Sequence, residues 1–303
     1  MAKKHDIIWL ESVDSTNEEC RRHISDIDNL SVVAALSQTS GKGQRCNRWI
    51  SSPGENLTFS VALKFPISGG AATGKSGLEP MHAYDQFVLS EITSLSVVEL
   101  LAEHGIEAKI KWPNDIYVAE KKICGILIEN SLRGEWIQHS IIGIGLNVNQ
   151  RNFDVTLPNP TSIVLCNEIS GETGSHNVSD SVTHYELHEL LEEFMHIFRG
   201  YMDRYCHIRG GYGRLRHMYL SHLWRKDEPT QFIDRKIAQS NDYASYRSFC
   251  TPCNPLCSPD ADTNNLPVFT GIIRGLSDAG LLILEMHDGT MQEFTFKEIS
   301  YFI

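Results

Sequence analysis

Three features that would assign the protein to a broad class are missing from its sequence. No apolar run is long enough to span a bilayer, and residues 1–6 lack the apolar core of a signal peptide. Positive charge is scarce, with 27 Lys and Arg against 38 Asp and Glu and a net charge of −11. This balance argues against general binding to nucleic acid or to an anionic membrane. We therefore expect a cytoplasmic protein with neither kind of partner.

Cysteine does not indicate a secreted disulfide framework. The chain has eight Cys residues and no secretory signal, so we expect reduced thiols. Cys250, Cys253 and Cys257 lie close together in the sequence, but a structural zinc site usually takes four ligands. We therefore favour free thiols over zinc and predict no protein-bound metal.

The pattern of the 303 residues predicts two domains of unequal size. Residues 1–235 combine apolar strands with helices. Residues 236–266 are expected to form a linker or insertion, because most of this segment is rich in Ser, Asn, Asp, Pro and Cys and shows no period. Residues 267–303 are strand-like throughout and too few to be stable alone.

Individual elements follow from hydrophobic periodicity and turn signals. Strands are expected at residues 7–10, 31–37, 57–65, 107–111, 122–128, 136–146, 269–273, 281–285 and 291–296. Helices are expected from residue 14, where Ser and Glu have capping-box spacing, and at 84–104, 183–205 and 214–224. The pattern of residues 84–104 indicates an amphipathic helix.

The segment Lys111 to Asp115, which reads Lys-Trp-Pro-Asn-Asp, is the most informative. It places a cation, a carboxamide and a carboxylate in a tight turn before an apolar strand that begins near Lys122. Surface loops rarely concentrate such residues unless they recognise charge or take part in catalysis. Asp115 could orient or deprotonate an amine, and an Asx-turn is the alternative. Lys122 and Lys111 could each attract a carboxylate or phosphate, or be ordinary strand-edge residues.

Residues 41–49 form a basic, Gly-containing loop that reads Gly-Lys-Gly-Gln-Arg-Cys-Asn-Arg-Trp. Glycines let backbone N–H groups approach an anion closely, and the three cations would neutralise it. This combination suits a phosphate or an acyl-phosphate, and a solvated basic loop is the alternative.

A second glycine motif, Gly143-Ile144-Gly145-Leu146-Asn147, ends the expected strand at residues 136–146. It is too short for a dinucleotide fingerprint, and no helix clearly follows it. We interpret the glycine pair as a surface that packs against a flat ring whose edge Asn147 contacts. A bulge without a ligand is the alternative.

Residues Gly69 to Ser76 match the P-loop pattern Gly-x4-Gly-Lys-Ser in full. A working P-loop needs a helix that begins at its Lys-Ser pair and faces the phosphates. Here Gly77 and Pro80 follow, and the expected helix begins only near Tyr84. We therefore interpret the match as a flexible insertion, and a P-loop NTPase that uses Lys75 is a minor alternative.

Taken together, these motifs resemble those of the biotin protein ligases, also called biotin–[acetyl-CoA-carboxylase] ligases. The resemblance covers about residues 5–235 and 267–303, and its ordered motifs are more specific jointly than singly. In chain order, the matching segments are Asp14 to Asn17, Gln38, Gly41 to Trp49, Lys111 to Asp115, Lys122 to Glu129, Gly143 to Asn147, and Pro158 to Ser162. The resemblance implies an α+β catalytic domain, with a mixed β-sheet and flanking helices like those of class II synthetases. It also implies a small SH3-like β-barrel at the C-terminus.

The resemblance implies a two-step, ATP-dependent reaction. Biotin and ATP would form biotinyl-5′-AMP, with Mg²⁺ on the triphosphate. A lysine of a biotin carboxyl carrier protein domain would then attack the acyl-phosphate. Three alternatives stay open: a lipoate or octanoate ligase of the same fold, the P-loop NTPase, and a non-catalytic binding module. A lipid pocket should lack the polar Ser, Thr, Asn and Gln set that suits a ureido ring.

The resemblance also assigns roles to individual residues. The expected catalytic residues are Lys122, Asp115, Arg45 and Lys42. The expected biotin-binding residues are Ser15, Thr16, Asn17, Gln38, Lys42, Gly43, Gln44, Lys122 and Gly125. The expected nucleotide-binding residues are Gly41, Arg45, Trp49, Lys111, Asn114 and Asn147. The cations would offset the repulsion between two anions, and the basic loop would order over the intermediate.

The sequence departs from the family pattern in the basic loop. Lys42 replaces the common Arg and loses its bidentate fork, and Gln44 stands where Arg is frequent. Cys46 stands where Gly is usual. We expect these changes to affect loop closure and retention of the adenylate. The sequence begins at the catalytic strand, without the helix-turn-helix of regulatory members, so we expect no repressor function. We expect a monomer or a weak homodimer.

Overall fold

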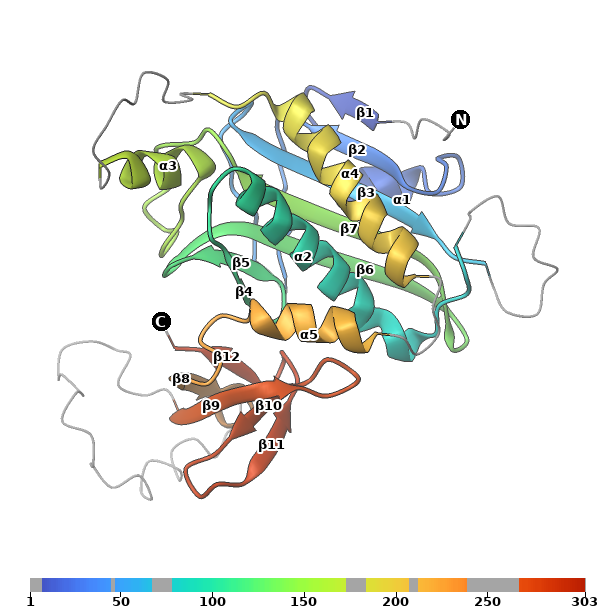
Figure 1. Cartoon of the computed structure of the whole chain (residues 1–303). Helices are drawn as coiled ribbons and strands as arrows, with labels where there is room; N and C mark the ends of the chain where they lie inside the picture. Colours follow the sequence, from blue (N-terminus) through green and yellow to red (C-terminus); the bar gives the residue numbers. More distant parts are fainter. Residues whose placement is uncertain are drawn as a thin grey trace. The chain divides into compact units, whose positions relative to one another are not determined.

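The structure is a computed structural model in which two compact units, Met1–Trp224 and Arg225–Ile303, each contain one β-sheet (Figure 1). It describes residues 7–44, 47–66, 78–172, 184–206, 212–238 and 267–302. No helix within these ranges is long and apolar enough to cross a membrane.

The first unit is built on a seven-stranded mixed sheet, as the sequence predicts. Its strands are β1 (Ile7–Leu10), β2 (Ser31–Ala35), β3 (Asn56–Lys64), β4 (Lys109–Lys111), β5 (Asp115–Val118), β6 (Lys121–Arg133) and β7 (Trp136–Asn147). Their order is β1-β2-β3-β7-β6-β5-β4. Only the β1–β2 pair is parallel among these pairings, and the others are antiparallel. The long strands β3, β6 and β7 lie together at the centre, where both faces can be covered.

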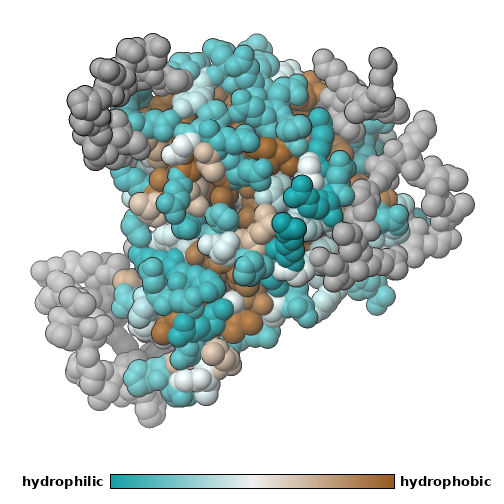
Figure 2. All heavy atoms as spheres, viewed as in Figure 1, coloured by the Kyte–Doolittle hydropathy of each residue, from teal (hydrophilic) through white to brown (hydrophobic). Residues whose placement is uncertain are grey.

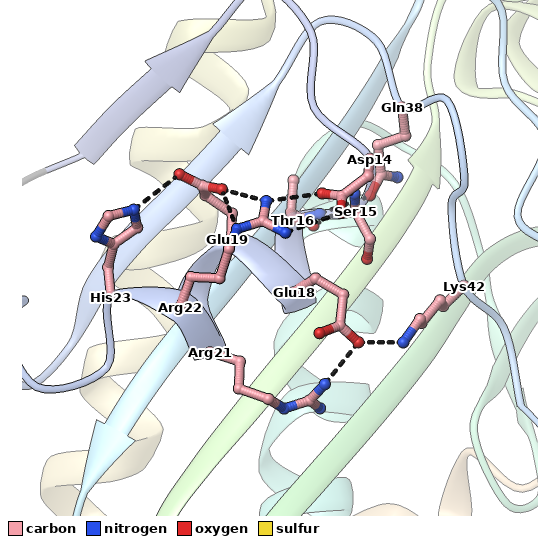
Figure 3. Close-up of polar contacts among 10 residues, drawn as sticks. All are labelled: Asp14, Ser15, Thr16, Glu18, Glu19, Arg21, Arg22, His23, Gln38 and Lys42. Carbon is pink, nitrogen blue, oxygen red and sulfur yellow. Dashed lines mark hydrogen bonds and ion pairs between the residues drawn. The ribbon is translucent and has the colours of Figure 1, made fainter.

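Helices cover the two faces of this sheet. They are α1 (Thr16–Arg22), α2 (Phe87–Glu103) preceded by the 3₁₀ turn η1 (Ala83–Gln86), α3 (Ile163–Glu172), α4 (Leu187–Tyr205) and α5 (Gly213–Ser221). Phe59 of β3 packs against Phe194 of α4 at 5.0 Å between ring centroids, whereas its neighbour Ser60 binds Asn17 of α1. Successive strand residues point to opposite faces. Therefore α1 and α4 lie on opposite sides of the sheet, as Figure 3 shows from the α1 side.

The helix α2 differs from the amphipathic helix that the sequence predicts. Thirteen of its 17 residues are buried, because α2 contacts α4, α5 and the strands β4 to β6. Its buried hydroxyl groups on Thr93 and Ser96 donate to backbone carbonyls one turn earlier, which satisfies them inside the helix. The fully buried Glu91 pairs with Arg216 of α5. Because α2 is enclosed on several sides, its apolar residues do not form one periodic stripe along the helix.

The helix α4, by contrast, has one apolar and one polar side. Leu190, Phe194 and Phe198 are buried against the sheet, whereas Glu192 and Glu193 are exposed. In the view of Figure 2, this face of the first unit is mostly hydrophilic, with smaller hydrophobic patches among the hydrophilic residues. The apolar side of α4 therefore supplies much of the core on this face.

The second unit contains a five-stranded antiparallel sheet. Its strands are β8 (Pro229–Asp234), β9 (Val268–Leu276), β10 (Leu282–Glu285), β11 (Met291–Phe294) and β12 (Ile299–Tyr301), in the order β11-β10-β9-β8-β12, and α6 (Arg235–Ala238) follows β8. This second sheet is consistent with the expected SH3-like domain. One strand differs from the prediction: β8 pairs with β9 and β12, so residues 229–234 belong to this sheet and not to the first domain. More than thirty residues separate β8 from β9 in the sequence, so local patterns did not indicate this pairing.

Candidate active site

A cavity of about 160 Å³ lies on the α1 face of the first sheet. It brings together segments that are far apart in the sequence. Of the residues predicted for the site, Ser15, Thr16, Asn17, Gln38, Lys42, Gly43, Gln44, Trp49, Asn114, Asp115, Lys122 and Gly125 line it. The sequence prediction missed the lining residues Asn47, Ile126, Leu127 and Ile144. Arg48, Gly143 and Gly145, which the sequence singled out for contact with an anion or a flat ring, line the cavity as well. All of the missed residues lie inside motifs that the sequence singles out, but a motif alone does not say which of its residues face a cavity.

Glycines form the floor of the cavity. Gly125 and Gly145 face each other on β6 and β7. A Cβ atom at Gly145 would lie 2.3 Å from the Trp49 ring, and one at Gly143 would lie 2.2 Å from Asn17 Oδ1. Because real Cβ atoms do not approach other atoms so closely, only glycine allows these side chains to lie on the sheet. The glycine pair predicts contact with a flat ring, and the ring found there is the chain's own Trp49.

One end of the cavity is lined by hydroxyl and carboxamide groups at the start of α1. The Thr16 backbone N–H donates to Gln38 Oε1 at 2.8 Å, and Ser60 Oγ donates to Asn17 Oδ1 at 2.6 Å. The Ser15 side chain makes no capping hydrogen bond, so the expected capping box does not form. The Gln38 side chain accepts from the Thr16 N–H in place of a capping side chain. It thereby links the segment that follows β2 to the start of α1 (Figure 3).

The other end of the cavity carries an ion pair. Lys122 Nζ lies 2.6 Å from Asp115 Oδ1, with side-chain exposures of 32% and 23%. The backbone of Lys122 is held on both sides, since its N–H donates to Asn159 O at 2.8 Å and its carbonyl accepts from Thr161 N at 2.9 Å. Asn114 exchanges hydrogen bonds with the backbone of Ile126 on β6. The side chains of the Lys111–Asp115 turn therefore bind other strands and hold the ammonium group at the cavity.

The basic loop folds back on itself beside α1. The Gly43 N–H donates to Asn47 O at 2.9 Å, and the Trp49 N–H donates to Gly41 O at 3.0 Å. Lys42 pairs with Glu18 of α1, and Glu18 also pairs with Arg21 at 2.5 Å (Figure 3). The bonds from Lys42 and then Arg21 lower the pKa of Glu18 below its ordinary value. In this arrangement Lys42 is at the cavity edge with an anionic partner already in place.

Three predicted nucleotide-binding residues do not line the cavity. Lys111 is 9% exposed, donates to Tyr117 Oη at 2.9 Å and lies 5.5 Å from the Trp224 ring centroid. Asn147 is buried and donates to Thr161 O at 2.9 Å. Gly41 lies at the base of the basic loop. Each of these residues supports a segment that reaches the cavity, and their contact with a nucleotide stays a prediction.

Several predicted features lie outside the described residues. They are Arg45, Cys46, the Gly69 to Ser76 match, Cys250, Cys253 and Cys257. Within the described part of the chain, Cys20, Cys124 and Cys206 are buried free thiols, and Cys166 is buried beside Thr161. The same residues contain no group of three or more His, Cys, Asp or Glu side chains that could hold a metal ion.

Comparisons with known proteins agree with this geometry. Residues 9–147 match the family model described as the Biotin/lipoate A/B protein ligase family. The chain is 28% identical over 186 residues to the bifunctional ligase/repressor BirA of Salmonella typhimurium, with coverage of 61% of this chain and 53% of the relative. It therefore spans about half the length (53%) of that relative. It is 26% identical over 279 residues to a biotin–[acetyl-CoA-carboxylase] ligase of Paracoccus denitrificans, with coverage of 91% and 92%.

A solved structure supports the fold as a whole. The biotin protein ligase of Aquifex aeolicus in complex with biotin and ATP has a TM-score of 0.65 to this chain at 22% identity, and the match covers 98% of both chains. At this identity the likeness establishes the fold. The match to the family model covers residues 9–147, which is less than half of the chain, and the fold agrees with that match.

Proposed function

We propose that the chain is an ATP-dependent biotin–protein ligase. It would form biotinyl-5′-AMP from biotin and ATP, and then transfer biotin to a lysine of a biotin carboxyl carrier protein domain. The observation that carries this proposal is a single cavity with a hydroxyl and carboxamide end, a glycine floor and an ammonium–carboxylate end. The relative from Paracoccus denitrificans and the Aquifex aeolicus complex support the same function.

The hydroxyl and carboxamide end suits a cyclic urea. Thr16, Asn17 and Gln38 offer donors and acceptors in a partly enclosed space, and a ureido ring has both. The dithiolane ring of lipoate has no hydrogen-bond donor and would leave the acceptor positions that these groups do not use within the protein unpaired, which costs free energy in a buried site. The polar end therefore favours biotin over lipoate or octanoate.

The charged end suits the first chemical step. A biotin carboxylate oxygen would form a bond to the α-phosphorus of ATP, while the bond from that phosphorus to the bridging oxygen breaks and pyrophosphate leaves with the electron pair. Two anions must approach each other for this step. Lys122, and Lys42 once it leaves Glu18, would lower their repulsion and stabilise the charge that develops on the phosphoryl oxygens. We propose that Mg²⁺ enters with the triphosphate.

The second step needs a neutral amine. The carrier lysine would attack the biotinyl carbonyl, the carbon–oxygen bond to AMP would break, and the amine would lose one proton. Asp115 is the carboxylate that lines the cavity at this end, so we assign it the role of orienting the amine and accepting that proton. The ion pair between Asp115 and Lys122 would link adenylation to amine attack, because binding of the adenylate to Lys122 would release Asp115 for the amine.

The nucleotide side of the site would involve the remaining predicted residues. We propose that Trp49 and Asn114 contact the nucleotide from the cavity wall, and that Gly41, Lys111 and Asn147 hold the segments around it. Arg45 would add a further cation from the basic loop. A cytoplasmic location and a monomeric or weakly dimeric state complete the proposal.

The test is mass spectrometry of a purified carrier domain after incubation with the chain, ATP and either biotin or lipoate. We expect a gain of one biotinyl group with biotin and ATP, and no gain without ATP. A lipoyl gain with no biotinyl gain would reverse the substrate assignment, and no gain with either acid would reject a ligase. Lys75→Ala should leave the yield nearly unchanged, whereas loss of ATP dependence would support the P-loop alternative.

A further inference from the structure

The carboxamide of Asn17 is held from two sides by residues outside the predicted site. Asn17 is 3% exposed and lines the cavity. Its Nδ2 donates to Glu129 Oε2 of β6 at 2.8 Å, and its Oδ1 accepts from Ser60 Oγ of β3 at 2.6 Å. The same Oδ1 lies over Gly143 of the cavity floor, as the 2.2 Å distance to a Cβ at that position shows.

Of these two neighbours, only Glu129 can decide which way the carboxamide points. The Leu127 carbonyl, which accepts from the same Nδ2 at a longer 3.5 Å, favours the same orientation. The Ser60 hydroxyl can donate or accept, so it tolerates either orientation. The Glu129 carboxylate only accepts, so it requires the NH₂ group of Asn17. A reversed carboxamide would set two acceptors against each other at hydrogen-bond distance. Glu129 therefore directs the amide oxygen of Asn17 toward Ser60 and Gly143.

Glu129 is itself kept in place by a cation. Arg21 Nη2 of α1 lies 2.8 Å from Glu129 Oε1, so one carboxylate oxygen faces Arg21 while the other accepts from Asn17. Glu129 also follows Gly125 and Leu127 at alternate positions along β6, which places its side chain on the same face as the cavity floor. The backbone of β6 and the Arg21 side chain of α1 therefore both hold Glu129 in place.

We propose that Glu129 is a positioning residue that sets the hydrogen-bond polarity of the biotin site. It acts through Asn17, whose remaining Oδ1 lone pair is presented to the ligand as an acceptor. The site therefore selects a ring with an N–H donor at this point, such as a cyclic urea, over a ring with an acceptor there. This inference rests on the proposed function, because it names how that same site recognises its acid.

The isosteric change Glu129→Gln tests the inference. The Gln oxygen would face Arg21, so its NH₂ group would face Asn17 and favour the reversed carboxamide. We expect the Kd for biotin, measured by calorimetry, to rise about tenfold, which corresponds to the loss of one hydrogen bond. The KM for ATP should not change, whereas a general structural defect would alter both.

Two further changes isolate the path through Asn17. In an Asn17→Ala background, Glu129→Gln should have no further effect on biotin affinity, because the group it positions is gone. Adding Arg21→Met to Glu129→Gln lets the Gln oxygen turn back to Asn17, so part of the affinity should return. The matched control is Glu19→Gln, which removes the charge of an acid of α1 that pairs with Arg22 (Figure 3).

A ligand series gives a direct readout of polarity. In the two cyclic carbamate analogues of biotin, an oxygen replaces one ureido N–H or the other. The unaltered chain should discriminate against at least one of them, and Glu129→Gln should reduce that discrimination about tenfold, because the reversed carboxamide can donate to the ring oxygen.

The outcomes separate this inference from the proposed function. Biotin binding with unchanged affinity and unchanged discrimination in Glu129→Gln would overturn the inference alone. Full additivity with Asn17→Ala would also overturn it, since Glu129 would then act by another path. Absence of biotin binding by the unaltered chain would overturn the proposed function and the inference together. Thermal unfolding of each variant shows that the comparison is made on folded protein.

Discussion

The two faces of the first sheet use the same strands for different purposes. On the α4 face, Phe59, Phe194 and Phe198 pack closely, and the rings of Phe194 and Phe198 stack at 5.7 Å. On the α1 face, the same region of the sheet carries Ser60 and a glycine floor, and it is hollow. Successive residues of one strand therefore supply packing on one side and recognition on the other.

The difference shows how the first unit accommodates a polar cavity beside its apolar core. The glycines of β6 and β7 contribute no side chain to packing on the α1 face. Large buried side chains of α2 and α4 pack on the opposite face. We expect substitutions on the α4 face to change stability, and substitutions on the α1 face to change ligand binding and catalysis.

The largest effect is expected on the α4 face. Phe194→Ala should reduce the free energy of unfolding by about 3–5 kcal/mol, because it removes a fully buried ring that contacts Phe59. Urea denaturation measures this change. The Kd for biotin of the folded fraction should stay the same, and a selective loss of biotin affinity at full stability would break the comparison. Phe194→Leu provides a milder variant with the same expected direction.

Lys122→Ala tests the charged end of the α1 face. It should lower the rate of biotin-dependent pyrophosphate release by about a hundredfold to a thousandfold, the effect of removing one charged group that stabilises a transition state. Stability should change little, since Lys122 is partly exposed. Lys121→Ala, an exposed neighbour on the same strand, is the control and should be nearly silent. Near-normal release by the Lys122 variant would reject the site assignment.

Gly145→Val tests the glycine floor. Its side chain would enter the space of the Trp49 ring, so we expect biotin affinity to fall about tenfold or more as that ring is displaced. Gly200→Ala is a matched control on α4, where a Cβ would meet nothing within 4 Å. That control should raise stability by about 0.5–1 kcal/mol, since Ala favours a helix interior over Gly. Unchanged binding in the Gly145 variant would show that the floor is not part of the ligand site.

The last comparison concerns buried thiols on both faces, whose substitution is not required. Burial raises the pKa of Cys20, on the α1 face, to about 12, and it raises the pKa of Cys206, next to α4, to about 12. A raised pKa means less thiolate at pH 8, so alkylation of both should be about a thousandfold slower than in urea. Peptide-resolved mass spectrometry measures the two rates. Fast alkylation of Cys20 alone would show that the α1 face is open beyond the glycine floor.

Local pattern predicted much of the first sheet. The expected strands at 7–10, 57–65 and 136–146 correspond to β1, β3 and β7 within about a residue or two, because a buried strand is a continuous apolar run. The short strands β5 and β12 and the helix α3 were missed. Each is short or begins in a segment rich in turn residues, so its pairing or packing partners decide its structure.

The site was predicted at the level of segments. The motifs around Asn17, Lys42 and Lys122 contain most of the cavity lining, because charged and small residues at these spacings have few structural uses. The sequence singled out Gly125 and the Gly143 and Gly145 pair, yet only the register between β6 and β7 places Gly125 opposite Gly145. The burial of Lys111 and Asn147 away from the cavity likewise depends on contacts with Tyr117 and Thr161.

Residue type and spacing were enough to predict which segments would carry chemistry, since they limit what a short segment can bind. Which side chains meet depends on the folded chain. Asn17 and Glu129 are 112 positions apart, and nothing local to either residue indicates that one fixes the orientation of the other. Strand register and the packing of α1 bring them to hydrogen-bond distance, because a sheet aligns residues by pairing and not by their distance along the chain.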